Sequence, residues 1–125
     1  RVLFRSPLSI VLAATGQSRL IRTLPPGVFW PPPRVESAIV RYDRRPDQVE
    51  RIADMERFLE LVHLFMSHRR KMLKACTRFA SDRGRPDWPV VFARADVDPT
   101  QRPETLSADH YIRLANACAQ EDAPR

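Results

Sequence analysis

The alternation of apolar and polar residues predicts two strands early in the chain. Residues 18–24 (SRLIRTL) alternate polar residues with larger apolar ones, which suits a strand. Residues 35–42 (VESAIVRY) give the clearer strand, with apolar side chains on both faces. Apolar residues on both faces are typical of a strand in a covered sheet. Because two strands of this kind are not stable alone, we expect them to join a larger sheet.

The segment between the predicted strands is stiffened by proline. Residues 25–34 (PPGVFWPPPR) contain five prolines, which lack backbone N–H donors, so neither a helix nor a central strand is expected there. Upstream, the apolar residues 8–14 (LSIVLAA) predict the end of a helix, and Gly16 follows at a C-cap-like position.

Apolar residues at helical spacing dominate the rest of the chain. Residues 43–52 are polar, and Asp54 is the expected N-cap of a helix that contains Phe58, Leu61, Val62 and Phe65. A second helix is expected from Ser67, with one apolar face made of Met72, Leu73, Cys76 and Phe79. A short helix is expected at 88–93, and a last helix, capped by Ser107, should bury Tyr111, Leu114, Ala115 and Cys118.

This order of elements predicts an α+β chain in four parts. Residues 1–45 should form the end of a strand-bearing domain, and residues 46–53 a linker. Residues 54–121 should form a helical domain, and residues 122–125 a disordered tail. A length of 125 residues suits one domain or the back part of a longer protein, and the absence of an initiator Met favours the latter.

Positive charge is concentrated in one segment. The chain carries 21 basic and 15 acidic residues, for a net charge of +6. Residues 68–85 alone hold seven basic residues and one acidic residue. Such a basic patch favours an anionic partner, of which nucleic acid is the commonest.

The predicted second helix would place part of this charge on one stripe. Arg70, Lys74 and Arg78 are spaced at i, i+4 and i+8, with Arg69 and Lys71 beside them. A helix of this kind could bind phosphates and release their condensed counterions. The alternative is a merely solvated basic face.

The aromatic residues of the proline-rich segment also allow two interpretations. An aromatic ring held by the prolines, that of Phe29 or Trp30, could stack on a nucleobase, and Arg34 could bind a phosphate or a neighbouring carboxylate. Alternatively, the segment is a rigid turn whose aromatic residues cap the core.

Several kinds of site are not expected. The three His residues lack metal-ligand spacing, and the three Gly residues are too scattered to cradle a phosphate or cofactor. The two Cys residues are expected to be reduced and buried, as in a cytosolic protein. We also expect no membrane span and no signal peptide.

Three motifs in sequence order resemble the KsgA-like ribosomal RNA adenine dimethyltransferase family. They are "PPGVFWPPPRVESAIVR", "FLELVHLFMSHRRKMLKA" and "VDPTQRPETLSADHYIRLANAC", and "PLSIVLA" is similar to a further segment upstream. The resemblance extends from Pro7 to about Ala119.

The resemblance implies that the chain is the C-terminal fragment of such an enzyme. It would hold the last two strands of a Rossmann-like methyltransferase sheet, followed by a small helical domain that docks on rRNA. The family dimethylates two adjacent adenines near the 3′ end of small-subunit rRNA with S-adenosylmethionine. By the resemblance, Phe29 stacks on the target base and Arg69 to Lys71 grip the rRNA backbone.

The resemblance also implies that the fragment alone is inactive. The family's cofactor loop and its Asn-Leu-Pro-Tyr-like tetrapeptide, which handles the adenine amine, are absent from the sequence. The implied partner is small-subunit rRNA in an immature 30S subunit, bound by a cytoplasmic monomer. Two alternatives stay open: an Erm-type large-subunit rRNA methyltransferase, and a stand-alone rRNA-binding or ribosome-assembly module without catalysis.

Overall fold

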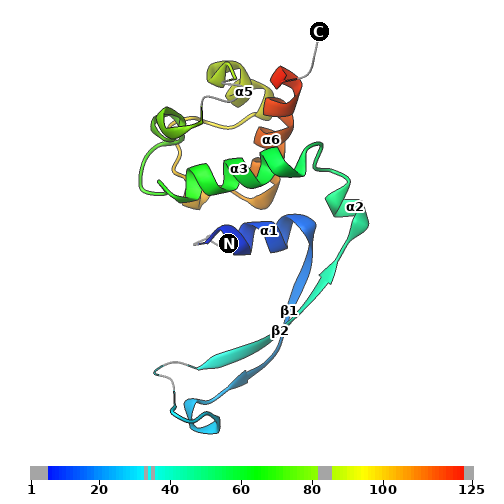
Figure 1. Ribbon diagram of the computed structural model, residues 1–125, viewed down its shortest axis with the longest axis vertical. Coiled ribbons are helices and arrows are strands. Elements are labelled where there is room, and N and C mark those ends of the chain that lie inside the picture. Colours follow the sequence, from blue (N-terminus) through cyan, green and yellow to red (C-terminus); the bar gives the residue numbers. More distant parts are fainter. Residues whose placement is uncertain (1–5, 33, 35, 82–85, 123–125) are drawn as a thin grey trace.

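A computed structural model describes residues 6–32, 34, 36–81 and 86–122 of the chain. Most of its helices gather into one body, from which a two-stranded antiparallel ribbon extends (Figure 1). The ribbon comprises β1 (Gly16–Leu24) and β2 (Ser37–Arg44). The longer helices are α1 (Pro7–Thr15), α3 (Met55–Met66), α5 (Trp88–Ala95) and α6 (Ala108–Asp122). The shorter ones are η1 (Pro26–Val28), α2 (Pro46–Val49), α4 (Leu73–Cys76), η2 (Thr77–Phe79) and η3 (Pro103–Thr105).

The helix starts predicted at Asp54 and Ser107 are confirmed by their hydrogen bonds. The Asp54 carboxylate accepts a hydrogen bond from the Arg57 N–H at 3.1 Å, which caps α3. At the start of α6, Ser107 Oγ accepts from the His110 N–H at 3.3 Å, and His110 Nδ1 accepts from the Ser107 N–H at 3.0 Å. This reciprocal pair acts as a capping box with histidine in place of the usual acid or amide.

The core lies where α1, α3, α5 and α6 meet. All the residues that helical spacing assigned to the cores of α3 and α6 are buried: Phe58, Leu61, Val62, Phe65, Tyr111, Leu114, Ala115 and Cys118. Ile10 and Ala14 of α1 belong to the same cluster. The Tyr111 hydroxyl donates to the Pro103 carbonyl oxygen at 2.9 Å, and burial raises its pKa well above the usual range. The predicted free, buried cysteines are confirmed for Cys76 and Cys118.

The predicted second helix from Ser67 is wrong. Residues 67–70 form a turn, and Met72 adopts an extended conformation (φ −61°, ψ 150°) before the four-residue α4. The N–H groups of Leu73 and Lys74 donate to the Gln101 and Pro99 carbonyl oxygens, at 2.8 and 3.0 Å. These bonds to a distant loop take the place of intrahelical ones. The expected apolar face is therefore split: Leu73 and Cys76 are fully buried, whereas Met72 and Phe79 are 39% and 53% exposed.

The ribbon confirms the two predicted strands and shifts their ends. β1 begins at Gly16, so α1 runs into the strand without a loop, and β2 continues to Arg44. Leu20 pairs with Val40 and Arg22 with Ile39, so that Ile21 is bulged. Val35, the expected first residue of the second strand, lies outside the described residues.

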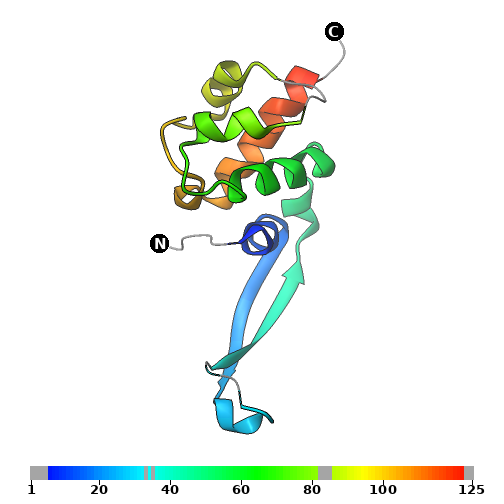
Figure 2. The ribbon, with the colours of Figure 1, turned by 60° about the vertical axis from the view of Figure 1, so that its left-hand side comes forward.

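Both faces of the ribbon carry exposed apolar side chains, namely Leu20, Ile21, Ile39, Val40 and Tyr42. The helical body covers neither face along most of the ribbon's length (Figure 2). The ribbon thus has the apolar composition of strands that are buried in a larger sheet, but no other described element packs on most of its length.

The residues expected to form a linker, 46–53, contain α2 and then a buried residue, Ile52. Asn116 of α6 holds this segment: its side chain accepts from the Ala53 N–H at 3.0 Å and donates to the Arg51 carbonyl oxygen at 2.8 Å. The proposed domain boundaries remain a prediction. Asp122 is the last residue of α6, and the rest of the expected tail lies outside the described residues.

Hydrogen bonds fix the ribbon to α1 and α2 at one joint. The Arg45 N–H donates to the Thr15 carbonyl oxygen at 2.9 Å, and the Thr15 and Tyr42 hydroxyls lie 2.6 Å apart. Gln48 Nε2 donates to the Ala13 and Gly16 carbonyl oxygens, each at 3.2 Å. The direction of the ribbon is therefore tied to the helical body.

Gly16 permits the close approach at this joint, and its replacement should loosen it. A Cβ atom there would collide with the Asp43 carbonyl oxygen and lie 2.7 Å from Tyr42 Cε1. We expect Gly16→Ala to destabilise the joint by about 1–3 kcal/mol through this overpacking. Amide exchange at Arg45 should then accelerate by at least about fivefold. Gly27→Ala is the matched control, because a Cβ at Gly27 meets nothing within 4 Å. Equal exchange rates in the two variants would contradict the prediction.

Candidate nucleic-acid interface

The turn that follows α3 carries three consecutive basic residues. We call residues 67–72 the basic loop; it contains Arg69, Arg70 and Lys71. Ser67 ends α3, where its N–H and hydroxyl both donate to the His63 carbonyl oxygen, at 3.0 and 2.7 Å. The Lys71 N–H closes the turn by donating to the His68 carbonyl oxygen at 2.9 Å. Basic side chains thus project from a short, hydrogen-bonded turn instead of a helix face.

A second segment, distant in sequence, supports the basic loop. Arg102 Nε donates to the Arg70 carbonyl oxygen at 3.0 Å. The loop that contains Arg102 is itself ordered by Asp98, whose carboxylate accepts from the Thr100 N–H and hydroxyl at 2.9 and 2.7 Å. These hydrogen bonds lower the pKa of Asp98. Two of the three sequence motifs therefore meet at one place in the structure.

A buried thiol contributes to the same support. Cys76 Sγ lies 3.4 Å from the His68 carbonyl oxygen and 3.8 Å from that of Lys71, as a hydrogen-bond donor to both. Burial raises the pKa of the Cys76 thiol, which keeps it protonated and able to donate. Carbonyl groups of the basic loop are thus bonded on its inner side.

The predicted cations are mostly exposed but do not form the expected stripe. Arg70, Lys71, Lys74 and Arg78 are exposed and Arg69 is half-buried. Because the helix is interrupted at Met72, the i, i+4, i+8 alignment of Arg70, Lys74 and Arg78 does not occur. Arg69, Arg70 and Lys71 instead line a hollow of about 350 Å³ together with Met66, Ser67 and His68. Among the described residues, no ion pair ties down Arg70, Lys71, Lys74 or Arg78.

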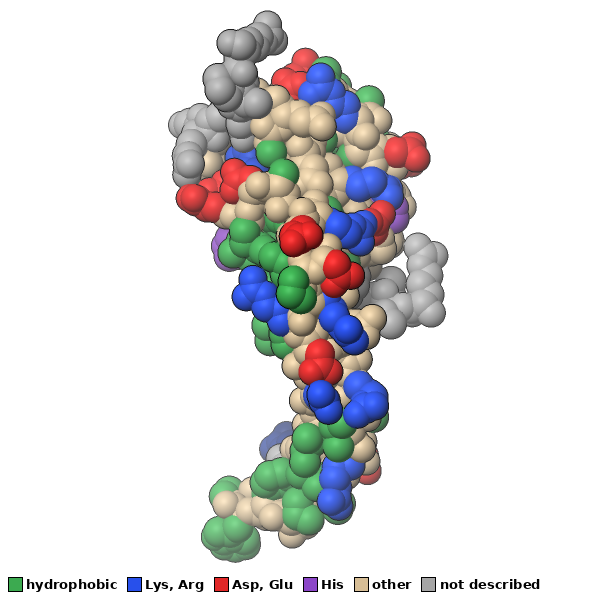
Figure 3. Space-filling model, turned by 90° about the vertical axis from the view of Figure 1, so that its right-hand side faces the viewer, with side chains coloured by type: hydrophobic (Ala, Val, Ile, Leu, Met, Phe, Trp, Pro, Cys, Tyr) green, Lys and Arg blue, Asp and Glu red, His purple; other side chains and the backbone are tan. Residues whose placement is uncertain are grey.

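The segment that joins β1 to β2 lies elsewhere, at the far end of the ribbon from the helical body (Figures 1 and 2). Phe29 and Arg34 belong to this segment. The Phe29 N–H donates to the Pro26 carbonyl oxygen at 3.2 Å, which closes η1. Phe29 is 39% exposed and Trp30 is 93% exposed. Figure 3 shows hydrophobic side chains gathered at this tip and basic ones along the ribbon above it. The structure therefore separates the predicted site residues into two groups.

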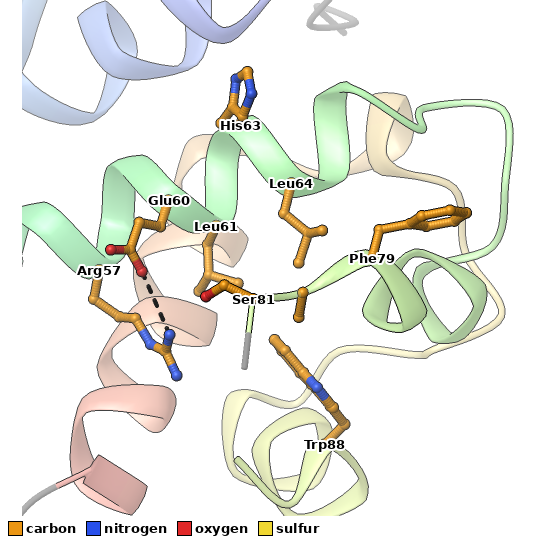
Figure 4. Close-up of a pocket in the computed structure, with 9 residues that line it drawn as sticks. Arg57, Glu60, Leu61, His63, Leu64, Phe79, Ser81 and Trp88 are labelled. Carbon is orange, nitrogen blue, oxygen red and sulfur yellow. Dashed lines mark hydrogen bonds and ion pairs between the residues drawn. The ribbon is translucent and has the colours of Figure 1, made fainter. Parts of the chain in front are cut away.

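The sequence did not predict a pocket of about 240 Å³ that lies between α3, the end of η2 and the start of α5. Its lining residues are Arg57, Glu60, Leu61, His63, Leu64, Phe79, Ala80, Ser81 and Trp88 (Figure 4). Phe79 and Trp88 resembled ordinary core positions in the sequence, and no local pattern marked them as pocket residues. Arg102 was also missed, although it lies within one of the quoted motifs.

Neither described glycine provides a cradle for a nucleotide cofactor. Gly16 packs against Tyr42 and Asp43 of the ribbon, and Gly27 faces open space. In residues 6–81 and 86–122, apart from the undescribed positions 33 and 35, no group of three His, Cys, Asp or Glu side chains could hold a metal ion. None of the described helices is both long and apolar enough to cross a membrane.

Solved structures share this fold. The chain superposes on a dimethyladenosine transferase from Plasmodium falciparum with a TM-score of 0.67 at 17% identity, covering 87% of this chain and 47% of that one. It is also similar to the 23S rRNA methyltransferase ErmE, with a TM-score of 0.59 at 22% identity, covering 92% and 46% of the two chains. The chain thus shares the fold of these two proteins, and the predicted α+β class is confirmed.

Sequence comparisons then define the family. Residues 4–120 match the family model described as ribosomal RNA adenine dimethylase, so the chain belongs to that family and the resemblance is confirmed. Proteins named ribosomal RNA small subunit methyltransferase A are similar to it: those of Xanthomonas euvesicatoria and Anaeromyxobacter dehalogenans are each 36% identical, over 87% and 88% of this chain. The chain spans only 39% and 38% of the length of these two relatives.

Proposed function

We propose that this chain is the C-terminal part of an S-adenosylmethionine-dependent enzyme that dimethylates two adjacent adenines near the 3′ end of small-subunit rRNA. Family membership and the names of the relatives support this choice of reaction. The observation that carries it is the exposed basic loop, supported by Arg102 from the family's closing motif. The enzyme would act as a cytoplasmic monomer on an immature 30S subunit.

The helical body would serve as the rRNA-docking part. The exposed cations Arg70, Lys71 and Lys74 lie on or next to a turn whose backbone groups bond inward, so their side chains are available for phosphates. Each phosphate that such a side chain neutralises releases condensed counterions, which favours binding without selecting a sequence. Arg69 and Arg78 would extend this contact.

The ribbon would serve the catalytic part in two ways. Its exposed apolar faces suit strands that complete a larger sheet, in which the cofactor loop would be carried by other residues. At its tip, Phe29 would stack on the target adenine, with Trp30 in support and Arg34 near a phosphate.

The chemistry explains why an aromatic ring is needed there. The exocyclic amine of adenine is a weak nucleophile, because its lone pair is delocalised into the ring. The base must leave the helical stack and be held so that the amine faces the methyl donor, S-adenosylmethionine. The described residues would contribute the stacking surface and the docking, and none of them is assigned to the methyl transfer itself.

The 125-residue chain alone should therefore bind RNA but not the cofactor. We expect calorimetry to detect no binding of S-adenosylmethionine or S-adenosylhomocysteine, because neither described glycine lines a cofactor cradle. A small-subunit rRNA fragment should bind in the same buffer, which serves as the positive control. Micromolar binding of either cofactor species to the chain would contradict this prediction.

The decisive experiment starts with the coding sequence upstream of Arg1. An open frame that encodes a Gly-rich acidic loop and an Asn-Leu-Pro-Tyr-like tetrapeptide would support the proposal. The protein from that complete frame should then transfer methyl groups to small-subunit rRNA adenines. A start or stop codon close to Arg1 would favour the stand-alone RNA-binding module. Transfer to large-subunit rRNA instead would favour the Erm-type alternative.

A further inference from the structure

Phe79 is an aromatic side chain in an unexpected environment. It ends η2 at the surface with 53% of its area exposed, one residue after Arg78. The His68 ring stacks on it, with centroids 4.0 Å apart and an angle of 16° between the rings. Lys71 Nζ lies 5.9 Å from the Phe79 centroid, within the range of a cation–π contact. The basic loop thus meets an exposed aromatic ring.

Phe79 also belongs to the pocket of Figure 4, where it lies beside Leu64 and across from Trp88. His68 lines the hollow of the basic loop, so the His68–Phe79 stack connects the hollow with the pocket. The pocket's volume of about 240 Å³ is below the roughly 300–1,000 Å³ of drug-sized sites. A single planar ring system fits this space better than a larger ligand.

We propose that one unpaired RNA base stacks against Phe79 at the mouth of this pocket while its neighbouring phosphates bind the basic loop. The inference rests on the proposed function and names the form of RNA that the docking surface takes. Stacking on an aromatic ring accepts any base, and the adjacent cations Arg70 and Lys71 supply the charge that a phosphate backbone requires. The site therefore selects single-stranded over paired RNA without reading a base.

The charge around Phe79 favours RNA over an apolar protein segment. Lys71 Nζ lies near the ring and Arg78 precedes Phe79 in the chain, and neither cation makes an ion pair with another described residue. An apolar peptide bound at this site would offer no anionic group to pair with these cations. For RNA, by contrast, cations beside an aromatic platform are the usual combination.

The test compares Phe79→Leu, which keeps the apolar bulk but removes the ring, with Phe79→Trp, which restores a stacking surface. The probes are an RNA hairpin with a single-stranded extension and the same hairpin without it. We expect Phe79→Leu to weaken binding of the extended RNA by about tenfold, within the range for loss of one stacked base. Phe79→Trp should retain the affinity, and binding of the blunt hairpin should not change. The slope of affinity against salt should stay constant, because no phosphate contact is removed.

A second measurement observes the stack directly in the unaltered chain. 2-Aminopurine placed in the extension should lose fluorescence on binding, and Phe79→Leu should abolish that loss. The control is Leu59→Ala, since Leu59 is a partly exposed apolar residue of the same helical body. If Phe79→Leu binds extended RNA as well as the unaltered chain does, the inference is wrong, although the proposed docking role stands. If the unaltered chain binds neither the extended nor the blunt hairpin, the stacking inference and the proposed docking role are both wrong.

Discussion

Replacing Arg70, Lys71 and Lys74 together with Gln should weaken rRNA binding on the order of 100-fold at about 0.1 M salt. All three side chains are exposed and lie on or beside the basic loop. If each neutralises one phosphate, the slope of log affinity against log salt should flatten by about 2 to 3. The loss should be similar for unrelated RNA sequences, because phosphate contacts do not distinguish bases. Filter binding over a series of salt concentrations measures both quantities.

The matched control for this variant removes the same charge from the ribbon. Arg19, Arg22 and Arg44 are likewise exposed, and their replacement by Gln lowers the net charge by the same amount. If only the net charge matters, the two variants should lose the same amount of RNA affinity. A specific docking surface predicts a much smaller change in slope for the ribbon variant. An unchanged slope in the basic-loop variant would show that the loop does not face RNA.

Phe65→Ala should lower the free energy of unfolding by about 3–5 kcal/mol, the range for removing a large buried aromatic side chain. Phe65 is fully buried on α3 and meets two other aromatic rings. Its centroid lies 6.2 Å from that of Trp88 and 6.4 Å from that of Tyr111. The cavity would therefore loosen α5 and α6 together, and urea unfolding followed by circular dichroism should show the loss.

A smaller change on the same helix provides the comparison. Leu59 lies on α3 with 44% of its area exposed, so Leu59→Ala should cost less than about 1 kcal/mol. Phe65→Leu keeps most of the apolar volume. Its loss of unfolding free energy should therefore lie between those of Leu59→Ala and Phe65→Ala. If Phe65→Ala costs no more than Leu59→Ala, then Phe65 does not join the helices as the structure indicates.

The elements that could be predicted from the sequence are those with strong local signals. Phe58 to Phe65 follow helical spacing behind an Asp54 cap, and both the helix and its cap occur. The described residues of the proline-rich tip form no α-helix and no strand, as expected because proline lacks an amide donor, but the exclusion of any helix was wrong. The Val28 and Phe29 amides still close the three-residue 3-10 helix η1. In contrast, α2 was missed, because the four residues Pro46–Val49 are too few to show an apolar period.

The segment after α3 shows why spacing alone failed. Its apolar residues fit a helix, but the Leu73 and Lys74 amides bond to a loop more than twenty residues away. No local pattern reveals such a partner. The hydrogen bond from Arg102 to the basic loop could not be predicted either, because its two partners are also far apart in sequence. The sequence therefore shows which residues carry the charge, whereas the arrangement of these residues depends on tertiary contacts.

The direct passage from α1 into β1 has a geometric consequence. α1 is packed into the core through Ile10 and Ala14, and Gly16 continues it into the strand without a loop. The nine residues of β1 span roughly 30 Å at about 3.3 Å each. Strand length thus sets how far Phe29 lies from the helical body that carries the proposed docking surface. Lengthening each strand by two residues would move Phe29 outward by about 7 Å and keep every side chain on its face. In the proposed enzyme, the distance between the docked region of the RNA and the methylated base would then depend on the number of residues in the ribbon.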